Sequence, residues 1–377
     1  MKILYITTVG CTMSFFKDLI KHLTDQGHTV DLACNEQDYK IDPFFHELKL
    51  KTFPLSCSRS PFSSGNVKAV KEIKEIVKNG DYDIVHCHTP IAAACTRLAC
   101  KGFRKKGLRV IYTAHGFHFY KGAPKQNWAI FYPLEKLCAR YTDTLITINR
   151  EDYELSKTKF KTTSTLYIPG VGIDTEHFAD TTCDREEKRK ELGIPDGAFL
   201  LLSVGELNEN KNHRTVIKAI SKLESKNVHY AVAGKGGERE NLLSLANELG
   251  LSDRIHLLGQ RKDIDELLKT ADAFLHPSLR EGLPVSVTEA LAAGLPCIVS
   301  DIRGCSDLVD ENGGFLCEPL DKDAFAEKIN RLMFDSALCA SMGEYNRQKA
   351  TQFDIKAIID SMCKIYGTQE RVETVAK

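Results

Sequence analysis

The sequence predicts two doubly wound α/β domains in series, each with a parallel sheet between two layers of helices. Short apolar runs alternate with stretches of helical spacing almost from one end of the chain to the other. The apolar runs carry hydrophobic residues on both faces, which is typical of parallel strands that are buried on both sides. The length of 377 residues also fits two domains, at roughly 150 residues per domain.

The expected strands are short apolar runs separated by segments of helical spacing. They are residues 2–9, 30–35, 83–88, 110–115, 145–149, 199–205, 229–234, 255–259, 273–276 and 297–300. The interval 157–185 interrupts the alternation, because it is polar, contains Ile168-Pro169-Gly170 and has no long periodic segment. We therefore expect this interval to connect a first domain, residues 1–168, to a second domain, residues 169–352, which a C-terminal segment follows.

Composition excludes several classes of protein. The chain is 42% apolar and 27% charged, as globular proteins are, and no apolar run approaches the ~20 residues of a membrane span. The N-terminal segment turns polar within a few residues, so we expect no secretory signal. The thirteen cysteines are odd in number and form no C-x-x-C pair. This usage favours reduced thiols in the cytoplasm.

The charges are distributed unevenly along the chain. Residues 1–168 contain 25 Lys and Arg against 16 Asp and Glu, a net charge of +9, whereas residues 169–377 contain 26 against 35, a net charge of −9. Six basic residues lie between Arg97 and Arg109, interleaved with apolar ones. A cationic amphipathic stretch of this kind is suited to an anionic membrane surface, and a solvated helix end is the alternative interpretation.

The most informative segment follows the strand 273–276. Pro284 fits the first turn of a helix, so Glu281 and the residues after it lie in the loop before a helix N-terminus. Free N–H groups and the positive end of the helix dipole attract phosphate there. The Glu281 carboxylate can accept hydrogen bonds from sugar hydroxyls, and Glu289 can reach a second diol. Alternatively, Glu281 is a solvated loop charge and Glu289 a surface residue.

Other expected strand ends carry further candidates. Lys211 lies at a helix start shortly after Gly205 and can neutralise a diphosphate, unless it is an ordinary exposed lysine. His115 stands beside a glycine at the end of its strand, where it can point toward a ligand or serve a structural role. Gly10 follows the first strand and permits close approach of the backbone to a ligand, or it is a simple turn residue.

Two further segments give weaker signals. His86-Cys87-His88 contains possible metal ligands, but on a strand residues 86 and 88 share one face while 87 points to the other, so these three cannot close on one ion. We therefore expect no metal site. Arg59 follows a weak strand and is a candidate for lining a ligand site.

Together these segments resemble one family. The strings Asp83–Pro90, Tyr112–Trp128 and Arg280–Glu289, and the chain as a whole, are similar to retaining glycosyltransferases of the GT-B fold in glycosyltransferase family 4. Within that family the chain is most similar to the EpsD-type and CapM-like enzymes of bacterial exopolysaccharide and capsule assembly. The resemblance implies two Rossmann-like domains that face each other across a cleft. The first would bind the acceptor and the second the nucleotide sugar, with a last helix in 353–377 packing back on the first.

The resemblance also implies roles for individual residues. His115 and Glu281 would be catalytic, with Glu281 holding hydroxyls of the donor sugar and His115 touching that sugar near the reacting carbon. The implied donor-binding residues are Gly10, Gly205, Lys211, Arg261, Gly282, Leu283 and Glu289. One position departs from the family pattern, because Glu206 stands where many members have an arginine. Lys211 or Arg280 would then have to compensate at the diphosphate.

The implied reaction moves a hexose or N-acetylhexosamine from a UDP-sugar to a hydroxyl of a polyprenyl-diphosphate-linked glycan, with retention of configuration. The resemblance implies no metal or other cofactor, because a helix dipole and Lys211 take the place of the cation. We expect a cytoplasmic protein, peripheral at the inner face of the plasma membrane, with no nucleic-acid partner. Two alternatives stay open: a nucleotide-sugar epimerase of the same fold, and a non-catalytic sugar-nucleotide-binding subunit of a transferase complex.

Overall fold

The computed structural model describes residues 1–367, which divide into two compact units. Unit 1 comprises Met1–Val171 together with the helix from Ile355 to Gly367, and unit 2 comprises Gly172–Asp354. The sequence places these boundaries after residues 168 and 352. Residues 368–377 of the expected last helix lie outside the described residues. None of the described helices is long and apolar enough to cross a bilayer.

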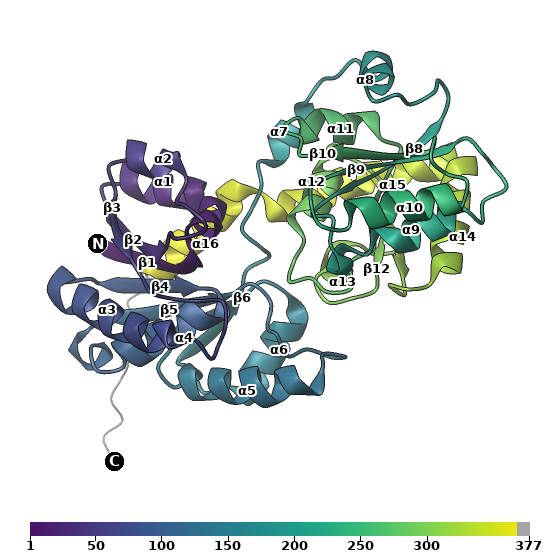
Figure 1. Ribbon diagram of the computed structural model, residues 1–377. Helices are drawn as coiled ribbons and strands as arrows, with labels where there is room; N and C mark the ends of the chain where they lie inside the picture. Colours follow the sequence, from purple (N-terminus) through teal and green to yellow (C-terminus); the bar gives the residue numbers. More distant parts are fainter. Residues whose placement is uncertain (368–377) are drawn as a thin grey trace. The chain divides into compact units, whose positions relative to one another are not determined.

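Unit 1 is built on a seven-stranded parallel sheet with the order β3-β2-β1-β4-β5-β6-β7 (Figure 1). Its strands are β1 (Lys2–Val9), β2 (Thr29–Asn35), β3 (Lys51–Pro54), β4 (Ile84–His88), β5 (Arg109–Ala114), β6 (Thr144–Thr147) and β7 (Ser164–Tyr167). The central strands are buried along almost their whole length. Burial on both faces explains why their sequences are continuous apolar runs.

Helices cover both faces of this sheet. The helical segments are η1 (Gly10–Phe16), α1 (Lys17–Asp25), α2 (Pro43–Glu47), α3 (Gly65–Gly80), α4 (Pro90–Cys100), η2 (Arg104–Lys106), α5 (Lys125–Ala139), α6 (Arg150–Lys159) and α16 (Ile355–Gly367). One apolar cluster lies between the sheet and α3, α4 and α5, and another lies between the opposite face and α1, α2 and α16.

The last helix, α16, is fixed to unit 1 by buried polar contacts as well as apolar packing. The Tyr366 hydroxyl lies 2.6 Å from His86 Nδ1 and also bonds the Tyr5 hydroxyl. Arg109 donates to the carbonyl oxygens of Ile365 and Tyr366, at 2.7 and 2.8 Å. A cation at the last carbonyls of a helix satisfies unpaired acceptors and complements the helix dipole. These contacts explain why the end of the chain belongs to the first unit.

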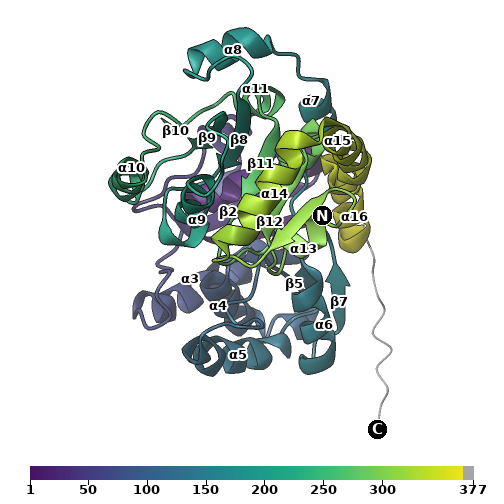
Figure 2. The same cartoon turned by 90° about the vertical axis from the view of Figure 1, so that its right-hand side faces the viewer.

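Unit 2 has a six-stranded parallel sheet with the order β10-β9-β8-β11-β12-β13 (Figure 2). Its strands are β8 (Phe199–Val204), β9 (Val228–Ala233), β10 (Ile255–Gly259), β11 (Ala273–His276), β12 (Cys297–Ser300) and β13 (Gly314–Cys317). Its helical segments are α7 (Thr175–Asp180), α8 (Arg185–Glu191), η3 (Glu209–Lys211), α9 (His213–Ile220), α10 (Arg239–Glu248), α11 (Ile264–Thr270), α12 (Val285–Ala293), α13 (Cys305–Leu308), α14 (Lys322–Phe334), α15 (Ser336–Ala350) and η4 (Thr351–Phe353). Separate apolar clusters fill the two faces of the sheet.

The prediction of two doubly wound parallel sheets is confirmed, and three strands are added. These are β3, β7 and β13, each four residues long and each at the edge of its sheet. Edge strands are less buried than central ones, so their sequences lack a clear apolar run. The interval 157–185 was expected to be only a connection, and this is wrong in part, because it contains β7 and α7.

The basic stretch between residues 97 and 109 is not a continuous amphipathic helix, which corrects the expectation from its spacing. Arg97 is buried at the end of α4, with Nη1 2.8 Å from Glu135 Oε2. Arg104 lies in the separate segment η2 and pairs with Asp143. The basic side chains of this stretch that stay exposed are Lys101, Lys105 and Lys106. About half of the basic residues therefore stabilise unit 1 from within.

Candidate active site

In unit 2 the strand order changes direction at β8, with β9 on one side of it and β11 on the other. Open parallel sheets bind ligands beyond the carboxyl ends of their strands at such a point. Lys211 follows β8 and Glu281 follows β11, so the topology brings two predicted site residues together. Lys211 Nζ lies 2.7 Å from Glu281 Oε1.

The Glu281 carboxylate is held through one oxygen only. Oε1 accepts from Lys211 Nζ and lies 3.0 Å from His276 Nε2, whereas Oε2 has no hydrogen-bond partner in the described part of the chain. Burial alone would raise the pKa of the Glu281 carboxyl, but His276 and Lys211 together hold that pKa at about 2. At neutral pH, Glu281 is therefore an ionised acceptor with one oxygen available to a ligand.

His276, the last residue of β11, was not singled out by sequence reasoning. It is buried, and its Nε2 is also 3.1 Å from Ser278 Oγ. Burial lowers the pKa of His276 below its ordinary value, although the Glu281 carboxylate opposes this. We infer that a neutral imidazole donates its N–H to Glu281. The signal in the sequence was its position, at the end of a strand and five residues before Glu281.

The loop after Glu281 presents backbone N–H groups. The expected helix is confirmed as α12, which follows Pro284 and ends at Gly294 in the left-handed conformation, with φ of 82°. Among the described residues, no acceptor contacts the N–H of Gly282 or Leu283. These donors lie at the positive end of the helix dipole, where an anion is favoured.

A buried arginine supports the same loop, and sequence reasoning missed it. Arg303, which follows β12, donates from Nε to the Glu281 carbonyl oxygen at 3.2 Å. At Gly304, φ is 81°, and a side chain there would place Cβ 2.3 Å from the Gly282 carbonyl oxygen. The Arg303-Gly304 pair therefore brings a cation and a close-fitting backbone against the Glu281 loop. An Arg-Gly dipeptide directly after a strand was the available signal.

Glu289 lies within α12, and its surroundings differ from those of Glu281. It is half-buried and makes no hydrogen bond or ion pair within residues 1–367. Burial raises the pKa of Glu289 to about 7. A carboxylate without an internal donor is available to hydroxyl donors of a ligand, such as a ribose diol.

Two other predicted donor residues, Gly205 and Arg261, and the departing position Glu206 have clear places. Gly205 leaves room for the Lys211 side chain, because a Cβ there would lie 3.2 Å from Lys211 Cε. Glu206 is exposed and accepts from Asn208 at 2.8 Å. Arg261, after β10, is not brought to the Lys211–Glu281 pair. It donates instead to Asp263 and Glu191, at 2.8 and 2.7 Å.

In unit 1, His115 lies just beyond the end of β5. Its Nε2 is 3.1 Å from Nδ1 of His88, the last residue of β4, and burial lowers the pKa of His115 to about 4. Gly10 is buried at the end of β1, where a Cβ would lie 2.5 Å from the Tyr39 carbonyl oxygen. The close approach expected at Gly10 is thus to the chain's own backbone.

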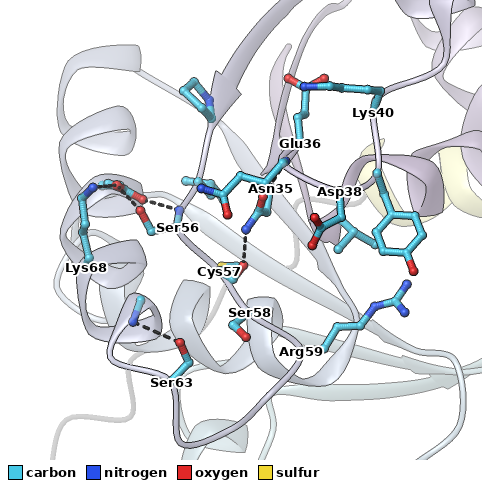
Figure 3. A pocket seen from close by; sticks show the side chains of 17 residues that line it. Asn35, Glu36, Asp38, Lys40, Ser56, Cys57, Ser58, Arg59, Ser63 and Lys68 are labelled. Carbon is cyan, nitrogen blue, oxygen red and sulfur yellow. Dashed lines mark hydrogen bonds and ion pairs between the residues drawn. The ribbon is translucent and has the colours of Figure 1, made fainter.

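A polar cavity of about 930 Å³ opens at the carboxyl ends of β1, β2 and β3 in unit 1 (Figure 3). Three hydrogen bonds shape its wall. Glu72 accepts from the Ser56 amide and hydroxyl at 2.7 and 2.8 Å, and Asn35 Nδ2 donates to the Cys57 carbonyl at 2.7 Å. These bonds tie the segment that follows β3 to the end of β2 and to α3, beside the cavity.

Four charged side chains that line this cavity have no ion pair within the described residues. They are Glu36, Asp38, Lys40 and Arg59. The Arg59 guanidinium lies over the Tyr39 ring, 4.7 Å from its centroid. Mixed charges beside an aromatic face can hydrogen-bond a polyhydroxylated ligand and cover its apolar side. Arg59, a weak candidate from the sequence, thus lines this cavity.

The raised pKa of Glu289 predicts a pH-dependent stability. A native pKa of about 7 against 4.5 corresponds to about 3 kcal/mol. Native Glu289 keeps its proton to higher pH than the unfolded chain does, so its contribution to stability is lost as pH rises from 4.5 through 7. Glu289→Gln should therefore be more stable than wild type at pH 8, with little difference at pH 5, in thermal or urea unfolding. Glu240→Gln, at an exposed position on α10, is the control and should leave the stability at pH 5 and at pH 8 unchanged. A Glu289→Gln protein less stable than wild type at pH 8 would contradict this account.

Comparison with known proteins places the chain in a family. Residues 2–149 match the family described as glycosyl transferase 4-like, and residues 184–349 match glycosyl transferases group 1. The putative glycosyltransferase EpsD of Bacillus subtilis is 36% identical over 100% of this chain and 99% of its own length.

Two more distant proteins extend the comparison. The UDP-Gal:alpha-D-GlcNAc-diphosphoundecaprenol alpha-1,3-galactosyltransferase of Escherichia coli is 29% identical over 91% of this chain and 90% of its own length. The crystal structure of Anabaena HepE in complex with UDP matches the fold with a TM-score of 0.81, at 20% identity, over 97% of this chain and 99% of that one. The chain is therefore a glycosyltransferase that belongs to glycosyltransferase family 4 and has the GT-B fold.

Proposed function

We propose that the enzyme transfers a hexose or N-acetylhexosamine, with retention of configuration, from a UDP-sugar to a lipid-linked glycan in bacterial exopolysaccharide or capsule biosynthesis. The observation that carries the proposal is the Glu281 carboxylate, ionised and with one oxygen free, beside Lys211 and the first N–H groups of α12. One edge of the sheet thus offers acceptors for sugar hydroxyls and donors for phosphate.

The diphosphate of the donor would bind where positive groups converge. Lys211, Arg303 and the Gly282–Leu283 amides supply that charge without a metal ion. Glu281 Oε2 would accept hydrogen bonds from the sugar hydroxyls, and the Glu289 carboxylate would accept them from the ribose hydroxyls. The UDP in the HepE structure supports the choice of nucleotide. The acceptor hydroxyl would attack on the face from which the phosphate departs, so the configuration would be retained. The departing phosphate would take the proton of that hydroxyl.

The acceptor would bind the cavity of unit 1 shown in Figure 3. Its free charges and the Tyr39 ring suit a saccharide, because charged groups bond hydroxyls and an aromatic ring covers the apolar face of a sugar. The E. coli relative acts on a sugar linked to diphosphoundecaprenol, which supports a lipid-linked acceptor.

We also propose peripheral contact with an anionic cytoplasmic membrane surface, since a lipid-linked acceptor resides there. The exposed side chains of Lys101, Lys105 and Lys106 are the part of the basic stretch that is free for this role. Each basic residue near such a surface contributes about 1 kcal/mol.

UDP should stabilise the protein in the presence of EDTA, by about 2.7 kcal/mol at 100 times its Kd. Lys211→Met should lose most of that stabilisation, because it removes a positive charge from the diphosphate site. Lys218→Met changes an exposed lysine of α9 and should keep it. Thermal unfolding with and without UDP measures both. Stabilisation that required a divalent cation would contradict the metal-free site.

Arg59→Ala should raise the KM for the acceptor about tenfold, equivalent to about 1.4 kcal/mol, and leave the KM for the UDP-sugar unchanged. Arg140→Ala, an exposed arginine of the same unit, is the control. Transfer is measured by release of UDP and by isolation of the extended glycan, which also separates a transferase from an epimerase. Equal changes in the two KM values would place Arg59 outside the acceptor site.

Changing both Lys105 and Lys106 to Glu should weaken binding to anionic vesicles, measured by sedimentation, by a few kcal/mol at most. High salt should weaken the binding of wild type in the same way. Reversing Lys190 and Lys226, two exposed lysines of unit 2, alters net charge equally and should have little effect. Equal binding of the two double mutants would show that the exposed lysines of unit 1 are not a membrane contact.

A further inference from the structure

Two histidines lie side by side at the carboxyl ends of neighbouring central strands in the unit 1 sheet. His88 ends β4, and His115 lies just beyond β5, which pairs with β4 in parallel register. His88 Nδ1 and His115 Nε2 are 3.1 Å apart, a hydrogen-bond distance. One of the two nitrogens must carry the shared proton.

His88 is sealed inside the unit. It is 1% exposed, and its ring stacks on Phe16 with 4.0 Å between centroids and on Tyr5 with 5.6 Å. Its other nitrogen, Nε2, is buried and has no hydrogen-bond partner among residues 1–367. The proposed function does not use this histidine, although it lies in a string that resembles the family.

Both rings are neutral at pH 7, because burial lowers the pKa of His88 well below its ordinary value and that of His115 to about 4. Each ring then carries one N–H, which leaves two arrangements. If His115 donates, the only N–H of His88 is the one on buried Nε2, where it finds no acceptor. If His88 donates, Nε2 is an unused acceptor, which folded proteins tolerate more often than a buried N–H without a partner.

We propose that His88 is a positioning residue that donates from Nδ1 to His115 and thereby fixes the proton of His115 on Nδ1. His115 then presents an N–H, not a lone pair, to whatever binds beside it. The Nδ1 of His115 makes no hydrogen bond within the described residues, so this donor is available. Resting on the proposed function, the group it would meet is an oxygen of a sugar substrate. His115 is accordingly a neutral hydrogen-bond donor and not a general base.

The proton position is measured directly by two-bond ¹H–¹⁵N correlation spectra of the full chain labelled at histidine, with His115 assigned by its loss in His115→Gln. We expect a protonated Nδ1 and an unprotonated Nε2 in wild type at pH 7. In His88→Phe, which keeps a ring against Phe16 but has no donor, His115 should shift toward the Nε2-protonated form. A His115 protonated on Nε2 in wild type, or unchanged in His88→Phe, would overturn the proposal.

Kinetics then separate this inference from the proposed function. His88→Phe should lower kcat/KM for sugar transfer about tenfold. His88→Asn, whose amide nitrogen lies where Nδ1 lies, should restore both the spectrum and most of the rate. If His88→Phe does not fold, the wild-type spectrum and His88→Asn still decide the proton position. A changed spectrum with unchanged transfer would keep the tautomer assignment and show that His115 does not contact a sugar substrate.

Discussion

One oxygen of the Glu281 carboxylate is held by two donors, Lys211 and His276, and the proposed donor site of unit 2 depends on that arrangement. The parallel sheet places β8 beside β11, so a lysine from one loop can meet a carboxylate from the next. Because the pair neutralises itself through Oε1, the other oxygen and the amides of Gly282 and Leu283 have no partner among the described residues. Arg303 supports the same loop by donating to the Glu281 carbonyl oxygen.

The two units share a sheet topology but differ in the chemistry at their strand ends. Unit 2 gathers charged groups around Glu281, although residues 169–377 carry a net charge of −9. Unit 1 places neutral imidazoles beyond β4 and β5 and a polar cavity beyond β1 to β3. The net charge of a unit therefore says little about its site, since local pairing decides which charges are free. Arg97 and Arg104 illustrate this, because they form ion pairs with Glu135 and Asp143 of the same unit.

Central strands and the helix α12 were predictable, because complete burial and the Pro284 and Gly294 signals leave strong patterns in the sequence. The edge strands β3, β7 and β13 were not, since partial burial demands no apolar run. For the site, strand-end position found Glu281 and Lys211 but could not show that they pair. His276 was not singled out, and the pairing of His88 with His115 was not foreseen, because a buried histidine reveals its partner only when neighbouring strands are aligned.

Hydrogen exchange of the backbone amides, measured with and without UDP, tests the central claim most directly. The account predicts slower exchange in two segments that are distant in sequence, residues 205–212 and 278–289. These segments follow the carboxyl ends of the neighbouring strands β8 and β11. Protection should follow UDP alone, in EDTA, with the cavity residues 35–40 and 56–68 of unit 1 unaffected. Protection confined to unit 1, or absent from the segment around Glu281, would contradict the placement of the donor site.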